Sequence, residues 1–123
     1  MNLNLLCRIN GVWIGLNGLS AILMPDMWFN MAGLEASSAA YAAAGGLGVA
    51  VIGLALISWR TVDIAGDAIK SYGMLFGIIH VLFLLLTLYQ MTVGLFGGPP
   101  AYMNIVVSII FGAAFFYYSK STD

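Results

Sequence analysis

The single histidine of the chain, His80, lies in the middle of the apolar run FGIIHVLFLLLTLYQ at residues 76–90. An imidazole there could bind a haem or a chlorophyll-type pigment, carry a proton, contact a lipid-soluble molecule, or form a hydrogen bond to a neighbouring helix. A haem held by two histidines of one chain is excluded, and a proton relay lacks a carboxylate at the same depth. We therefore expect His80 to be a neutral residue that joins helices through a hydrogen bond. An axial-ligand role at a haem or pigment is the minor alternative.

The other side chains that could do chemistry form no convincing catalytic group. Cys7 has no second cysteine to pair with, and we expect it to be a small buried apolar residue. Asp63 and Asp67 have the i, i+4 spacing of a carboxylate pair, but they lie between Arg60 and Lys70. Such residues more commonly form a solvated turn with a helix cap. No spacing predicts a metal site, and we expect no enzymatic activity.

Apolar residues dominate the composition. Of the 123 residues, 62% are hydrophobic and 7% are charged, whereas a soluble domain contains roughly 45–50% apolar and 25% charged residues. Four basic and five acidic side chains give a net charge of -1, with no basic run that could neutralise nucleic-acid phosphates. The composition predicts an integral membrane protein of one domain and argues against nucleic acid as a partner.

Four apolar segments are long enough to cross a bilayer, which takes about 20 residues of helix. The expected spans are residues 5–24, 38–59, 71–91 and 101–118. Pro25 ends the first span, and we expect GGPP at 97–100 to break the chain before the fourth. The segment PDMWFNMAGLEASSA predicts a short helix at the membrane interface. The expected fold is an all-α bundle of four transmembrane helices, whose first helix is retained and is not cleaved as a signal peptide.

The basic residues predict the orientation. Arg8, Arg60, Lys70 and Lys120 flank span ends that all fall on one side of the membrane, and the two loops on the other side contain no Lys or Arg. Cytoplasmic loops carry the excess of basic residues. We therefore expect both termini to be cytoplasmic, in a plasma membrane of inner or intracytoplasmic type.

Small and polar residues lie on one face of each expected span. Between helices in lipid the hydrophobic drive is small, so close glycine contacts and hydrogen bonds hold helices together. The glycines expected at such contacts are Gly11, Gly15, Gly18, Gly46, Gly53, Gly73, Gly77 and Gly112. The polar residues expected in the bundle interior, as partners of His80 or as ligand contacts, are Asn17, Thr87, Asn104 and Ser108.

The sequence resembles small prokaryotic four-helix membrane proteins related to DoxX. The resemblance lies in RINGVWIGLNGLSAILMPDMW, in the following MAGLE, and in AAGGLGVAVIGLALISWR, so it covers mainly the first half of the chain. It implies a fold and no specific activity. The cysteine-based features of some redox relatives are absent, because Cys7 is the single cysteine.

Three functions remain open. We expect first a non-catalytic accessory or scaffold subunit that packs through bulky apolar helix faces in a larger respiratory, photosynthetic or oxygenase complex. The alternative is a small binder or carrier of a hydrophobic ligand such as a quinone, lipid or pigment, with His80 and the buried amides as polar contacts. A transporter of a neutral solute is the second alternative.

Overall fold

The computed structural model describes residues 1–121, and these residues form helices and no strand. Four helices are long and apolar enough to cross a membrane. The elements are α1 (Leu3–Leu23), α2 (Pro25–Ala32), α3 (Ser38–Ile64), the 3-10 turn η1 (Gly66–Ala68), α4 (Ile69–Thr92) and α5 (Gly98–Lys120). The four expected long apolar helices are confirmed, and a short helix follows the first, while the interfacial position of that short helix stays a prediction. Among the described residues, the length and composition of these helices indicate a membrane helical bundle.

Two helix ends differ from expectation, each for a local reason. α3 continues to Ile64, past the expected end at Trp59, because Arg60 and Asp63 pair with each other on this last turn and remain helical. The prolines of the GGPP sequence do not break the chain before α5. The break lies instead in the link 93–97 and at the two glycines, since Gly97 is the extended N-cap of α5 and Gly98 has a positive φ. The prolines themselves belong to the first turn of α5, where the missing N–H costs no hydrogen bond.

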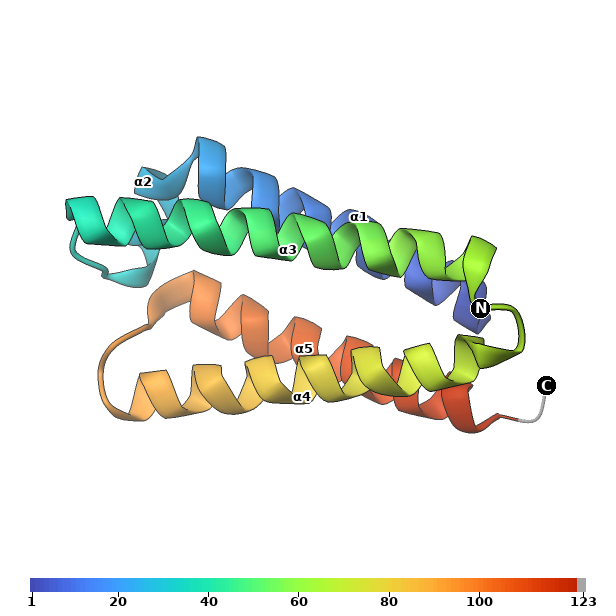
Figure 1. Ribbon diagram of the computed structural model, residues 1–123. Coiled ribbons are helices and arrows are strands. Elements are labelled where there is room, and N and C mark those ends of the chain that lie inside the picture. Colours follow the sequence, from blue (N-terminus) through green and yellow to red (C-terminus); the bar gives the residue numbers. More distant parts are fainter. Residues whose placement is uncertain (122–123) are drawn as a thin grey trace.

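The long helices associate as two antiparallel pairs, α1 with α3 and α4 with α5 (Figure 1). Glycines bring α1 and α3 together. A Cβ atom at Gly11 would lie 3.0 Å from the carbonyl oxygen of Ala55, and one at Gly18 would lie 2.8 Å from that of Gly48. Gly15 lies against the Cβ of Ala55. The three glycines expected on α1 therefore do lie at a helix contact.

The expectation for α3 is wrong in its choice of glycines. A Cβ atom at Gly46 or Gly53 would meet nothing within 4 Å. The close approach is made by Gly48, where a Cβ would lie 2.7 Å from the carbonyl oxygen of Gly18 and 2.6 Å from a side-chain carbon of Ile22. Small residues occur on several faces of this helix, so their spacing does not reveal which face meets α1.

The second pair also packs through small residues. A side chain at Gly73 would collide with Ser119 Oγ and with Leu3, and one at Gly77 would lie 2.9 Å from the ring of Phe116. Gly112 of α5 is buried opposite Gly77 and the Cβ of His80. These three expected contact positions are at helix interfaces.

The two pairs meet most closely at the end that carries the N-terminus. An apolar core there joins α1, α4 and α5, and its buried members are Leu3, Leu6, Cys7, Phe76 and Phe115. Cys7 is thus buried, as expected. From η1, α3 and α4 diverge towards the other end of the bundle (Figure 1).

At that other end, α2 lies on α5. The N–H of Gly97 donates a hydrogen bond of 3.3 Å to the carbonyl of Ala32. Gly98 has φ of 67°, and a side chain on it would collide with the carbonyl of Met31. Gly98 is needed here because the left-handed conformation and the close backbone contact both exclude a Cβ atom.

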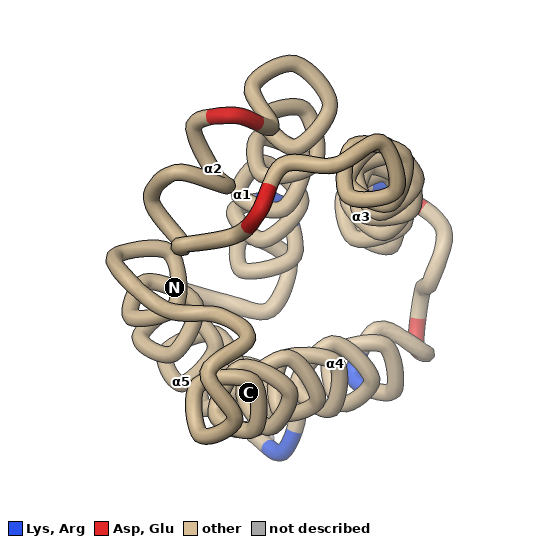
Figure 2. Tube along the Cα trace, turned by 90° about the vertical axis from the view of Figure 1, so that its left-hand side faces the viewer, with Lys and Arg blue, Asp and Glu red and all other residues tan. Residues whose placement is uncertain are grey.

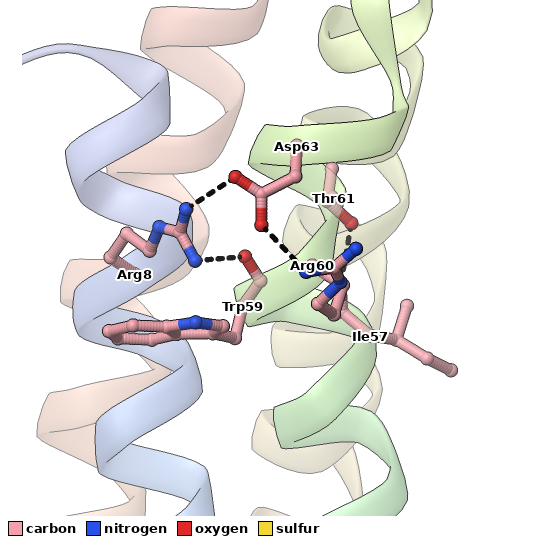
Figure 3. Close-up of polar contacts among 6 residues, drawn as sticks. All are labelled: Arg8, Ile57, Trp59, Arg60, Thr61 and Asp63. Atoms are coloured by element: carbon pink, nitrogen blue, oxygen red, sulfur yellow. Dashed lines mark hydrogen bonds and ion pairs between the residues drawn. The ribbon is translucent and has the colours of Figure 1, made fainter.

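The charged side chains divide between the two ends. Arg8 of α1 donates to Asp63 Oδ1 at 2.7 Å and to the carbonyl of Trp59 at 2.8 Å, and its guanidinium lies 4.4 Å from the centre of the Trp59 ring (Figure 3). Arg60 contacts the other oxygen of Asp63 at 3.3 Å. The expected carboxylate turn is therefore an ion-pair network between α1 and α3, and Asp63 takes part in it from the last turn of α3.

The start of α1 and the end of α5 both lie at this basic end of the bundle (Figure 1). Lys70 donates to the carbonyl of Ser121, and Lys120 lies in the last turn of α5. At the opposite end the charged residues are acidic, Asp26 in α2 and Glu35 in the link that follows it (Figure 2). The bundle is therefore electrically polarised along its length.

We predict that Gly48→Ala destabilises the bundle by about 1–3 kcal/mol, because its Cβ would overlap Gly18 and Ile22. Gly46→Ala on the same helix is the matched control and should be neutral or slightly stabilising, because space is open there and Ala is the better helix former. Unfolding by SDS, followed by circular dichroism in mild detergent, measures both. Equal effects of the two substitutions would contradict this account of the α1–α3 contact.

Candidate ligand-binding site

A chain of three hydrogen bonds crosses the interior of the bundle. Ser58 Oγ of α3 donates to the carbonyl of Cys7 at 2.8 Å, Asn10 Nδ2 donates to Ser58 Oγ at 3.0 Å, and Asn10 Oδ1 lies 2.8 Å from His80 Nε2. Ser58 is 0% exposed, Asn10 1% and His80 6%. A polar group left alone at membrane depth is costly. The chain removes that cost for all three side chains and ties α4 to the α1–α3 pair.

His80 joins helices through a hydrogen bond, as the sequence led us to expect, but its partner is Asn10. The candidates named from the sequence were Asn17, Thr87, Asn104 and Ser108. Counting residues from the ends of the spans places a side chain in depth only to about one turn, or 5.4 Å. Asn10 precedes Asn17 by seven residues, about two turns, on the same side of α1, so the stagger between α1 and α4 decides which of the two meets His80.

Aromatic rings fix the plane of the imidazole. The His80 ring stacks on Phe111 with centres 5.2 Å apart and planes 11° apart, and Phe115 lies 6.0 Å away at 18°. Both phenylalanines come from α5, on either side of Gly112. The imidazole is thus held edge-on by Asn10 and face-on by α5, so it cannot turn freely.

A cavity of about 260 Å³ lies between the two helix pairs on the α2 side of His80. Its walls come from all five α-helices, from Leu34 in the link before α3 and from Phe96 in the link before α5. Most of the wall is apolar, with Trp13, Ile14, Leu47, Val51, Phe83 and Val107 among its residues. For comparison, a cavity of roughly 150 Å³ lined by apolar side chains holds a benzene molecule. The space is large enough for a ring that carries substituents.

Four of the polar residues predicted from the sequence line this cavity: Asn17, His80, Asn104 and Ser108. Asn17 Nδ2 is already bonded to the carbonyl of Trp13, at 2.9 Å in its own helix. Asn104 and Ser108 lie one turn apart on α5. Ser108 is buried, but Asn104, which we expected in the bundle interior, is exposed, although it lines the cavity. Thr87, also buried, is outside the cavity lining.

Three contributors to the site were missed from the sequence. Asn10 and Ser58 orient His80, although a Ser in a small-residue helix gives no distinct signal. Trp28 is the third, and its Nε1 donates to Ser20 Oγ at 2.8 Å, which fixes the indole in the cavity lining. The burial of Pro100 and Phe96 nearby depends on how the α4–α5 link folds, which no periodic pattern reports.

The arrangement offers no metal centre among the described residues, because no three His, Cys, Asp or Glu side chains come together there. His80 Nε2 is engaged by Asn10. Any axial-ligand role of this histidine would therefore fall to Nδ1. The chemistry that the site supports is recognition of a mostly apolar molecule with a small polar group.

No family model matches the chain, and neither a curated protein nor a solved structure matches it. The resemblance to DoxX-related proteins stays a prediction.

We predict that His80→Leu destabilises the bundle by about 1–2 kcal/mol, because Asn10 Oδ1 is then buried without a donor. His80→Gln should cost less than half as much, since the side-chain amide nitrogen of glutamine can donate the hydrogen bond to Asn10 in place of His80 Nε2. SDS unfolding in mild detergent measures the difference. If the glutamine variant is as unstable as the leucine variant, the bond to Asn10 contributes little and the interpretation is wrong.

Proposed function

We propose that the protein binds a membrane-soluble amphiphile, such as a quinone-type ring, a lipid or a pigment, in the cavity between its two helix pairs. The observation that carries the proposal is the position of His80, a buried and oriented imidazole on the wall of an apolar cavity of about 260 Å³. Ligand sites are concave and mainly apolar, with a few fixed polar groups that orient the ligand. Asn104 and Ser108 supply two more such groups on the same wall.

The position of the cavity supports entry from the lipid. Its α3 wall is formed by Ala44, Leu47, Gly48 and Val51, and its α4 wall by His80 and Phe83. The ribbons of these two helices diverge towards the α2 end (Figure 1), and α2 packs against α5. The proposed entry for a molecule dissolved in the bilayer is between α3 and α4, where no polar loop has to be crossed.

Two other roles expected from the sequence stay predictions. Leu16, Leu56, Leu82 and Ile110 are among many large apolar residues that are exposed on the outer faces of the bundle. Lipid alone accounts for such faces, so they do not by themselves favour an accessory subunit of a larger complex. Transport of a neutral solute would need a path through both ends, and the core at the N-terminal end closes one of them.

We predict that Ala44→Phe abolishes ligand binding, because the new ring would fill the cavity from α3. Ala43→Phe is the matched control. It adds the same ring at an exposed position outside the cavity lining, and should leave binding intact. The measurement is native mass spectrometry and solvent extraction of protein purified from its own membranes. A bound small molecule present in the wild type and Ala43→Phe, but absent from Ala44→Phe, is expected. Equal content in all three proteins would count against this cavity as the site.

We further propose that the basic end of the bundle, with both termini, faces the cytoplasm. In a Cys7→Ser background, Ala36→Cys lies at the acidic end and Asp67→Cys at the basic end, both at exposed positions. A membrane-impermeant maleimide applied to intact cells should label position 36 and not position 67. After the cells are opened both should react, which is the control for accessibility. Labelling of position 67 alone in intact cells would reverse the orientation.

A further inference from the structure

The hydrogen-bond chain beside the cavity has a fixed direction, which starts at a backbone carbonyl. The carbonyl oxygen of Cys7 can only accept, so Ser58, at 2.8 Å, must donate its single hydroxyl proton to it. Ser58 Oγ must then accept from Asn10 at 3.0 Å, which only the Nδ2 side of that amide can provide. The orientation of the Asn10 amide therefore follows from the direction of these hydrogen bonds.

The same direction fixes the protonation of His80. With Nδ2 of Asn10 directed at Ser58, its Oδ1 is the atom that faces His80 Nε2 at 2.8 Å. An amide oxygen only accepts, so Nε2 carries a hydrogen and donates it. The imidazole is neutral in this apolar interior, because an unpaired charge at this depth is strongly disfavoured. Its single N–H is thus on Nε2, and Nδ1 has a free lone pair.

Nδ1 is accessible. Among the described residues, Ser119 Oγ is the one side-chain polar atom that is both fully enclosed and without a partner. Nδ1 has no hydrogen-bond partner among the described residues and is not one of the fully enclosed atoms, so it retains accessible surface. His80 lies between two spaces, the large cavity and a small void of about 40 Å³. Asn10, which binds Nε2, lines the small void and not the cavity, so we infer that Nδ1 faces the cavity.

We propose that the ligand of this cavity is an apolar molecule with a hydroxyl or N–H group, which donates a hydrogen bond to His80 Nδ1. The inference rests on the proposed function and narrows its ligand class. A group that can only accept, such as the carbonyl of an oxidised quinone or an ether oxygen, would face the lone pair of Nδ1 and be repelled. A quinol, a phenol or a long-chain alcohol fits. Asn104 and Ser108 can each donate or accept, so they suit a second polar group of either kind, and the selection for a donor comes from His80 Nδ1 alone.

The first test uses two probes of the same shape, 4-hexylphenol and its methyl ether 4-hexylanisole. Their binding to the full chain in nanodiscs is measured by calorimetry, with empty nanodiscs subtracted. The phenol should bind the wild type about tenfold more tightly than the ether, the effect of one hydrogen bond. In His80→Leu the two affinities should become equal. If the wild type binds both compounds equally, the donor requirement is overturned while the cavity remains a binding site. If it binds neither, the proposed function itself fails.

The second test does not depend on a variant that must fold. Because His80 is the single histidine, ¹⁵N-histidine labelling gives one pair of ring signals. Solid-state NMR of the wild type in lipid should show hydrogen on Nε2 and a bare Nδ1. Addition of 4-hexylphenol, and not of 4-hexylanisole, should move the Nδ1 signal towards that of a hydrogen-bonded nitrogen. Hydrogen on Nδ1 in the ligand-free protein would overturn the proposal.

Discussion

The hydrogen bond between Asn10 and His80 is the interaction on which the interior of this bundle depends. It joins the α1–α3 pair to α4 at a depth where water cannot replace a lost partner. Individual hydrogen bonds between membrane helices contribute modestly, about 0.6 kcal/mol on average. This one has a further effect, because it belongs to a chain that starts at the Cys7 carbonyl and passes through Ser58. The chain gives the imidazole one orientation and one tautomer.

The packing on either side of that bond is unequal. On the side towards the N-terminus, Leu6, Phe76 and Phe115 close the interior, and Arg8 binds Asp63 across α1 and α3. On the side towards α2, the two helix pairs separate and leave the cavity. Close backbone contacts at glycines, as at Gly48, hold each helix pair together internally. The two pairs can therefore separate from each other at one end without either pair coming apart. The interior is therefore tightly packed at the end that carries the N-terminus and contains the cavity towards the α2 end.

The amino-acid sequence by itself determined the four long apolar helices, the short helix after the first, and the placement of all four basic residues at one end. These are local properties: bilayer thickness sets the length of an apolar run, and Pro25 marks a helix boundary wherever the helix packs. It also determined that His80 would need a partner inside the bundle, because lipid offers none. The types of residue in the interior follow from the same constraint.

Only the tertiary structure decided which residues meet. Asn10 and not Asn17 reaches His80, and Gly48 rather than Gly46 or Gly53 meets α1. These choices depend on the rotation, tilt and stagger of whole helices, and a shift of one turn moves a side chain by about 5.4 Å. The cavity has the same origin, since it is the space left where two pairs diverge. No periodicity within a single helix encodes the relation between two helices, so the site could be anticipated in its residue types but not in its contacts.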